Sequence, residues 1–203
     1  MMNVGVLASG TGSNFQALVQ ALAADDSAKV VALVCNVPSA AVLERAKELE
    51  VPAVVMDHRQ WPSREAFDDA LVHELKLRHV ELVCLAGYMR LLTPRFLNQF
   101  PQGVINVHPA LLPAFPGIRA VRQAIAAGVR VAGCTIHYVD EGADTGPIVA
   151  QAAVPVLPED DEASLSARIQ QQEHRLLPAV VKAIASGTVR LEGRSVHLKE
   201  WIG

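Results

Sequence analysis

Short apolar runs alternate along the first half of the chain with segments whose apolar residues recur every three or four positions. The first run covers residues 4–8, and Phe15, Leu18 and Leu22 follow it at helical spacing. The same apolar pattern predicts four further strands, at residues 30–35, 51–56, 80–86 and 103–107. Helices are predicted between them, at residues 42–50 and 63–75 and just after Pro94. This alternation indicates βαβ units and a mostly parallel α/β sheet with helices on both faces.

The pattern changes after residue 107. Residues 109–117 contain three prolines and one glycine, which predicts an ordered loop with little conformational freedom. The elements predicted beyond it are a helix at 120–127, strands at 131–139 and 148–156, a long helix at 164–186 and a closing C-terminal hairpin at 188–198. Because no repeat or flexible linker interrupts the pattern, we expect one domain over residues 1–203. Its two halves, 1–100 and 101–203, are separated only by this topological change.

Composition and charge narrow the class of protein. The chain has 203 residues, of which 51% are hydrophobic and 19% charged, as expected of a compact globular protein. A net charge of −3 argues against general binding to nucleic acid or to an anionic membrane. The uncharged N-terminal stretch lacks the basic segment of a signal peptide. Three scattered cysteines, Cys35, Cys84 and Cys134, form neither a disulfide framework nor a metal knuckle, so we expect a cytoplasmic protein.

A glycine-rich segment, SGTGSN at residues 9–14, lies between the first predicted strand and the first predicted helix. Glycines let the backbone approach an anion, and the free N–H groups of the first helical turn point at it. The spacing is GxGxN, and Asn36 replaces the acidic residue that would hold a ribose, so a single phosphate fits better than a dinucleotide. A side chain at Gly12 would then occupy the position of the anion. A plain glycine turn capped by Ser13 or Asn14 is the alternative.

Asn106 and His108 lie at the carboxyl end of the fifth predicted strand. Residues two apart on a strand point to the same side, at the edge where open α/β sheets bind ligands. An amide donor beside an imidazole suits a carbonyl under nucleophilic attack, because one group binds the oxyanion and the other moves protons. A capping asparagine with a histidine bonded to the proline loop explains the same spacing equally well.

Residues 140–147, DEGADTGP, form a tight turn with three carboxylates. A carboxylate of this turn beside His108 would fix the tautomer of the imidazole and keep it charged. A solvated acidic turn is the simpler explanation of this segment taken alone. The turn lacks the ligand alternation of a calcium loop, and His108 and His137 have no zinc-motif spacing, so we expect no metal.

Five motifs in this order resemble the phosphoribosylglycinamide formyltransferases, folate-dependent enzymes of purine biosynthesis, over nearly the whole chain. The motifs are SGTGSN at 9–14, LAGYMR at 85–90, NVHP and LLP at 106–113, DEGADTGP at 140–147, and QEH at 172–174. The resemblance implies a Rossmann-like formyltransferase fold. It also implies transfer of a formyl group from 10-formyltetrahydrofolate to the amine of glycinamide ribonucleotide. The implied partners are these two small molecules, without nucleic acid, membrane or metal, and the chain would be a monomer or homodimer.

The resemblance also implies roles for individual residues. The catalytic trio would be Asn106, His108 and Asp144. The ribonucleotide would be bound by Gly12, Ser13, Asn14, Gln172, Glu173 and His174, although the last three alone would be read as a solvated helix face. The folate site would be lined by Arg64, Met89, Arg90, Leu91, Leu92, Asp140, Glu141, Gly142, Ala143 and Asp144. Residues 1–100 would thus be the phosphate-binding half, and residues 101–203 the catalytic and folate-binding half.

The chemistry of the implied trio suggests a mechanism. Asn106 and protonated His108 would stabilise the tetrahedral oxyanion, and Asp144 would keep His108 charged, with a water carrying the proton of the amine. A formyltetrahydrofolate hydrolase of the same fold is the alternative, but it would have no ribonucleotide for the glycine loop to hold. A methionyl-tRNA formyltransferase would need a basic surface and usually an extra domain. A non-catalytic sensor of phosphorylated metabolites would leave the trio without a purpose.

Overall fold

The computed structural model describes residues 1–100, 102–199 and 202, and the chain divides into unit 1 (Met1–Asn106) and unit 2 (Val107–Gly203). Within the described residues, seven strands are hydrogen-bonded in the order β3-β2-β1-β4-β5-β6-β7. Their bounds are β1 Met2–Ala8, β2 Ala28–Cys35, β3 Ala53–Val55, β4 Leu82–Leu85, β5 Val104–His108, β6 Val131–Tyr138 and β7 Ile148–Pro155. Strand β1 pairs in parallel with β2 and β4, β2 with β3, and β4 with β5, whereas β6 pairs antiparallel with β7. The predicted mostly parallel α/β sheet is confirmed.

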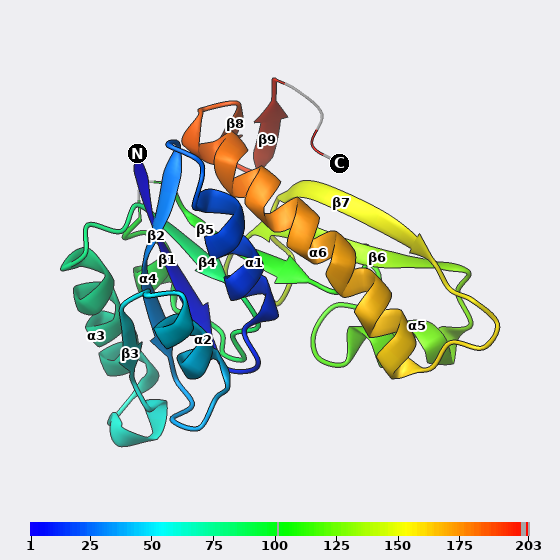
Figure 1. Cartoon of the computed structure of the whole chain (residues 1–203), viewed down its shortest axis with the longest axis horizontal. Coiled ribbons are helices and arrows are strands. Elements are labelled where there is room, and N and C mark those ends of the chain that lie inside the picture. Colours follow the sequence, from blue (N-terminus) through cyan, green and yellow to red (C-terminus); the bar gives the residue numbers. More distant parts are fainter. Residues whose placement is uncertain (101, 200–201, 203) are drawn as a thin grey trace. The chain divides into compact units, whose positions relative to one another are not determined.

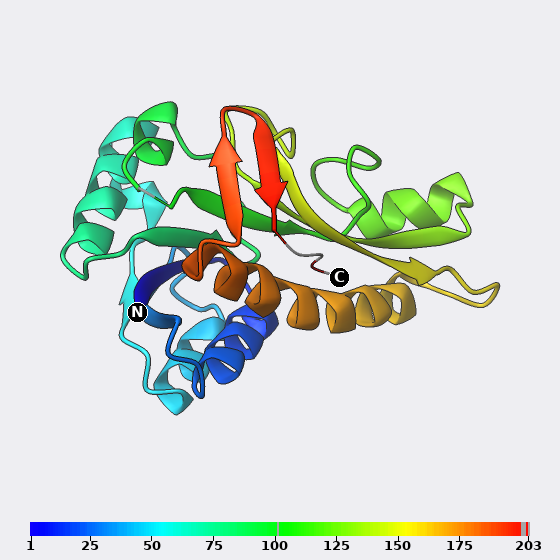
Figure 2. The same cartoon turned by 90° about the horizontal axis from the view of Figure 1, so that it is seen from above.

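Helices cover the strands of unit 1 on both faces. The helices are α1 (Ser13–Leu22), α2 (Val42–Glu48), the 3-10 helix η1 (His58–Gln60), α3 (Arg64–Lys76) and α4 (Pro94–Leu97). Figure 2 shows α1 and α2 on one face of these strands and α3 and α4 on the other. Every residue of β4 is buried, which explains why its sequence is a continuous apolar run rather than an alternating one. Because β4 is buried along its whole length, its packing fixes the position of the loop that follows its carboxyl end.

Unit 2 is built around the antiparallel pair β6 and β7, with α5 (Ala120–Ala127), α6 (Glu162–Ala185) and a hairpin of β8 (Val189–Glu192) and β9 (Ser195–Leu198). Helix α6 lies along β6 and β7 (Figure 1). It begins with a capping box, in which Asp161 accepts from the Ser164 N–H at 2.8 Å and Ser164 Oγ accepts from the Asp161 N–H at 3.0 Å. The closing hairpin predicted from the sequence is confirmed.

Local chemistry explains where the predicted boundaries shift. Helix α6 begins at Glu162 rather than residue 164, because Asp161 supplies the cap. Strand β3 keeps only three of the six residues predicted, since it is an edge strand paired with β2 alone. Strand β5 continues to His108, one residue beyond the predicted end. Among the described residues, no helix is both long enough and apolar enough to span a bilayer.

Candidate active site

Ser9 connects the glycine-rich segment to the loop that follows β4. Its backbone N–H donates to the carbonyl of Gly87 at 3.1 Å, and its hydroxyl accepts from the Met89 N–H at 3.0 Å. The same hydroxyl donates to Asn36 Oδ1 at 2.6 Å. Asn36, at the position where a dinucleotide fold carries its ribose-binding acid, is therefore a structural partner of the glycine loop.

Helix α2 holds the other side of the glycine loop. Arg45 Nε donates to the carbonyl of Thr11 at 2.7 Å, and the Val42 N–H donates to the carbonyl of Gly10 at 3.1 Å. Gly12 has a φ of 79°, and a Cβ built on it would lie 2.4 Å from Val42 Cγ2. The expectation that a side chain at Gly12 would occupy the anion's position is therefore wrong, because that side chain would run into α2.

Gly12→Ala should lower the free energy of unfolding by about 2–4 kcal/mol. The left-handed backbone costs a non-glycine residue about 1–2 kcal/mol, and the clash with Val42 adds an overpacking term of similar size. Gly10→Ala is the matched control, because a Cβ there has no atom within 4 Å. Urea denaturation of both variants measures the difference, and equal stability would contradict this role for Gly12.

Helix α3 anchors the segment after β4 that contains the predicted folate-site residues of unit 1. Arg64 Nη2 donates to the carbonyl of Leu92 at 2.9 Å. One turn later, buried Asp68 accepts from the Thr93 N–H at 2.7 Å through Oδ2. These two bonds fix the backbone of Leu92 and Thr93 against the amino-terminal end of α3.

The anchored segment presents apolar side chains to solvent. Met89 is 70% exposed and Leu91 is 56% exposed, whereas Leu92 is buried. The Arg90 guanidinium lies 5.3 Å from the centroid of the Phe67 ring, a cation–π contact that holds this side chain over α3. The structure thus brings Arg64 and residues 89–92 together in unit 1 and leaves an exposed apolar surface beside them.

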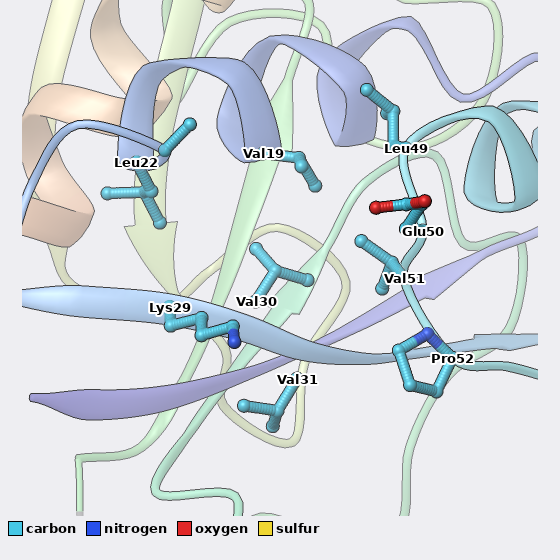
Figure 3. Close-up of a pocket in the computed structure, with 10 residues that line it drawn as sticks. Val19, Leu22, Lys29, Val30, Val31, Leu49, Glu50, Val51 and Pro52 are labelled. Carbon is cyan, nitrogen blue, oxygen red and sulfur yellow. The ribbon is translucent and has the colours of Figure 1, made fainter.

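A hollow of about 490 Å³ in unit 1 lies away from these loops (Figure 3). Its lining is aliphatic apart from Lys29 and Glu50. Residues 29–31 of the lining belong to the start of β2, which pairs with the start of β1, whereas the glycine loop follows the end of β1. The hollow is therefore at the amino-terminal ends of the strands, and the candidate chemistry is at their carboxyl ends.

In unit 2, two histidines share the carboxylate of Asp144. His108 Nδ1 lies 3.3 Å from Asp144 Oδ2, and His137 Nε2 lies 3.6 Å from Asp144 Oδ1. His108 and His137 are both buried. The pairing of His108 with Asp144, which the family resemblance implied, is thus present, and His137 is a third member of the cluster.

The second nitrogen of each imidazole faces a backbone carbonyl. His108 Nε2 lies 2.9 Å from the Phe115 oxygen, and His137 Nδ1 lies 2.8 Å from the Tyr138 oxygen. A carbonyl only accepts hydrogen bonds, so each of these nitrogens carries a proton. The nitrogen that faces Asp144 can donate only if the ring is also protonated there. The geometry therefore gives each ring an acceptor at both nitrogens, a backbone carbonyl at one and the Asp144 carboxylate at the other.

The ionisation of Asp144 is consistent with this arrangement. Burial alone would raise the pKa of Asp144, but its contact with His137, the Gly117 N–H at 2.7 Å and the charges of both histidines outweigh burial. The pKa of Asp144 is therefore held below its usual value. The residue remains a carboxylate throughout the neutral range.

The proline loop at residues 109–117, which supplies the Phe115 carbonyl and the Gly117 N–H, is clamped by buried Thr135. Thr135 Oγ1 donates to the carbonyl of Ala110 at 2.6 Å and accepts from the Leu112 N–H at 3.1 Å. Gln151 Nε2 donates to Thr135 Oγ1 at 3.0 Å and to the Leu112 carbonyl at 2.9 Å. The loop also carries Phe115 at a φ of 53°, a strained conformation that these contacts help to maintain.

Asn106 belongs to β5, two residues before His108, so the two side chains leave the strand on the same side. Strand β5 pairs in parallel with β4, with Asn106 opposite Leu85. Asn106 is only half-buried, whereas its neighbours Ile105 and Val107 are buried. Strand geometry thus gives Asn106 and His108 the common orientation expected from their spacing.

The segment at residues 172–174 lies in the middle of α6. Glu173 is 6% exposed, and Gln172 and His174 are half-buried. A solvated helix face, the simplest prediction from this segment alone, is therefore wrong for Glu173. A charged residue is rarely buried without a specific role or partner, so Glu173 stays a candidate for binding.

The cysteines agree with ordinary core packing. All three cysteines are buried and free, and burial raises the pKa of Cys84 to about 12. Among the described residues, no group of three or more histidine, cysteine or acidic side chains could hold a metal ion.

The chain is similar to known proteins along most of its length. Residues 2–181 match the family described as formyl transferase. The phosphoribosylglycinamide formyltransferase of Bacillus subtilis is 45% identical over 91% of this chain and 95% of that protein. The trifunctional purine biosynthetic protein adenosine-3 of Drosophila pseudoobscura pseudoobscura is 46% identical over 92% of this chain, which spans 14% of its length. The crystal structure of glycinamide ribonucleotide transformylase 1 from Symbiobacterium toebii has a TM-score of 0.95 at 46% identity, covering 98% of this chain and 95% of that one. The chain belongs to the formyl transferase family.

Proposed function

We propose that this chain transfers a formyl group from 10-formyltetrahydrofolate to the amine of glycinamide ribonucleotide, in purine biosynthesis. The observation that carries the proposal is the pairing of His108 Nδ1 with Asp144 Oδ2 at 3.3 Å. His108 lies on β5, the strand that also contains Asn106. The names of the bacterial relatives, which match this chain over almost their full length, support the same reaction.

Asn106 and His108 would act on the formyl carbonyl. An attacking amine turns that carbonyl oxygen into an oxyanion, which needs hydrogen-bond donors placed in advance. The Asn106 amide is one such donor. Asp144 engages Nδ1 of His108, so Nε2 is the nitrogen that can reach the substrate, and the substrate oxygen would take over the bond now made to the Phe115 carbonyl.

Asp144 would keep a negative charge beside His108 and assist the proton transfer. The amine of the substrate attacks only in its neutral form, and it loses a proton as the new C–N bond forms. A water between the amine and the Asp144 carboxylate could carry that proton to the departing nitrogen of tetrahydrofolate. His137 would keep the carboxylate ionised and aimed through its contact with Oδ1.

Binding roles would be divided among the remaining segments. Gly12, Ser13 and Asn14 would bind the phosphate of the ribonucleotide with the N–H groups at the start of α1. Gln172, Glu173 and His174 would hold the rest of that substrate. The folate would contact Arg64, residues 89–92 and the turn at residues 140–144, where exposed Met89 and Leu91 offer an apolar surface to its rings.

Incubation of the purified chain with 10-formyltetrahydrofolate, with and without glycinamide ribonucleotide, tests the proposal. We expect formylglycinamide ribonucleotide and tetrahydrofolate to form in equal amounts, and only when both substrates are present. Chromatography of the ribonucleotide and absorbance of the folate measure the two products. Release of formate without the ribonucleotide, at the same rate, would instead identify the alternative activity, a formyltetrahydrofolate hydrolase.

A further inference from the structure

The tip of the C-terminal hairpin is bonded to the acidic turn of unit 2. Arg194 Nη1 donates to Asp140 Oδ2 at 2.8 Å, and Arg194 Nη2 donates to the backbone carbonyl of Thr145 at 2.8 Å. Arg194 is separated from Asp140 by 54 residues and from Thr145 by 49 residues. Figure 2 shows the hairpin of β8 and β9 reaching this turn. The hairpin lies beyond the residues that match the family.

Asp140 also organises the turn from within. Its Oδ1 accepts from the Gly142 N–H at 3.1 Å and from the Thr145 hydroxyl at 2.7 Å. Burial raises the pKa of Asp140, but the bonds from Thr145, Arg194 and Gly142 outweigh it and lower the pKa overall. The carboxylate is therefore charged at neutral pH and can bind a guanidinium. Arg194 closes the turn by joining its first residue to its sixth.

The closed turn contains Asp144, next to Thr145. Asp144 has a φ of 57°, in the left-handed region, which is less favourable for a residue with a Cβ than for glycine. In this conformation its carboxylate reaches His108, His137 and the Gly117 N–H. A guanidinium that fixes the adjoining Thr145 carbonyl therefore restrains the backbone from which the Asp144 side chain projects.

We infer that Arg194 is a positioning residue, which holds the turn at residues 140–145 in the conformation that brings Asp144 to His108. The inference rests on the proposed function for its effect on catalysis, but not for its effect on the turn. Arg194 itself is 70% exposed and acts through Asp140 and Thr145. Its planar fork serves two acceptors at once, a geometry that a lysine cannot reproduce.

Amide hydrogen exchange measured by NMR tests the inference without reference to activity. In Arg194→Ala, the Gly142 and Gly117 amides, which donate to Asp140 and Asp144, should exchange about 2- to 5-fold faster. Arg190→Ala, which removes another exposed arginine of the same hairpin, should leave both rates unchanged. Arg194→Lys should recover less than half of the protection. Unchanged rates in Arg194→Ala would overturn the inference. Equal acceleration throughout α6 and β7 would also overturn it, because Arg194 would then support general stability.

Formyl-transfer kinetics of the same variants provide the second readout. Arg194→Ala should lower kcat and raise the KM for 10-formyltetrahydrofolate by about 2- to 5-fold each, with the KM for the ribonucleotide unchanged. The difference from the wild type should shrink as ionic strength rises from about 0.01 M to about 1 M, because salt screens an exposed ion pair. If both KM values rise equally, the positioning role is contradicted. A wild-type chain without formyl transfer would refute the proposed function, and the exchange rates would still decide the role of Arg194.

Discussion

Asp144→Asn should lower kcat for formyl transfer by about 10²- to 10³-fold while leaving the fold intact. The amide keeps the shape of the carboxylate and can still accept from the Gly117 N–H, but it removes the negative charge between two histidines. Each ring keeps its proton on the nitrogen that faces a carbonyl, so the loss of Asp144 favours the neutral rings. A neutral His108 is a weaker partner for a developing oxyanion, and losses of this size follow the removal of one such stabilising group.

Steady-state kinetics and NMR of the ring nitrogens measure the two parts of this prediction. At pH 7 the wild type should show His108 as imidazolium, and Asp144→Asn should show it as the neutral tautomer. Asp69→Asn, which removes an exposed carboxylate paired with Arg95, is the matched control and should leave kcat unchanged. An unchanged His108 protonation state in Asp144→Asn would contradict the electrostatic role and leave Asp144 to position water or the folate turn.

The lowered pKa of Asp144 also fixes how stability depends on pH. A carboxyl whose pKa is lower in the folded than in the unfolded state stabilises the fold above the unfolded value of about 3.9. That contribution is lost as the pH falls through the lower, folded value. The difference in unfolding free energy between wild type and Asp144→Asn should therefore shrink as the pH falls below about 4, where the histidines of both proteins are protonated. A difference that grows as the pH falls below about 4 would contradict the lowered pKa.

The predictability of the fold depended on how each element is buried. Helix α5 lies at the predicted residues 120–127, because its ends coincide with clear changes in sequence pattern. Strand β4 was found as a continuous apolar run, since parallel strands covered on both faces need no polar side. The 3-10 helix η1 was not predicted, because three residues are too few to show a period.

The candidate site could be predicted only where a local pattern encodes it. Strand alternation gave the common orientation of Asn106 and His108, and the structure keeps both in β5. Alternation gave no orientation for His137, because seven of the eight residues of β6, from Ala132 to Tyr138, are buried. The helical spacing of apolar residues in α6 predicts the burial of Glu173. Ile169 and Leu177 lie four residues to either side of it and are buried on the same helix face.

No local sequence pattern predicts the contacts between segments that are far apart in the chain. The bond from Arg194 to Asp140 joins residues 54 positions apart, and nothing near either residue indicates the other. The carbonyl of Phe115 and the N–H of Gly117 act through the backbone, so no side-chain motif marks them. Such partners depend on how the chain is folded, and they decide which protonation states His108 and Asp144 adopt.

Asn106→Ala should lower kcat by about 10²-fold or more and change both KM values much less. The Asn106 amide would bond more strongly to the oxyanion than to the formyl group of the bound substrate, so its loss raises the barrier without weakening binding equally. Steady-state kinetics with each substrate varied in turn separate kcat from the two KM values. Asn98→Ala, at an exposed asparagine that ends α4, is the control and should behave as the wild type.

Asn106→Asp sharpens the test, because it keeps the size of the side chain and replaces the donating NH₂ with an acceptor. A carboxylate next to the developing oxyanion would repel it, so kcat for Asn106→Asp should fall below that of Asn106→Ala at pH 7. On lowering the pH toward the pKa of the new carboxyl, that variant alone should regain activity relative to Asn106→Ala, since the protonated acid can donate a hydrogen bond. If Asn106→Asp is instead as active as the wild type, or if only a KM rises in Asn106→Ala, Asn106 binds substrate without stabilising the oxyanion.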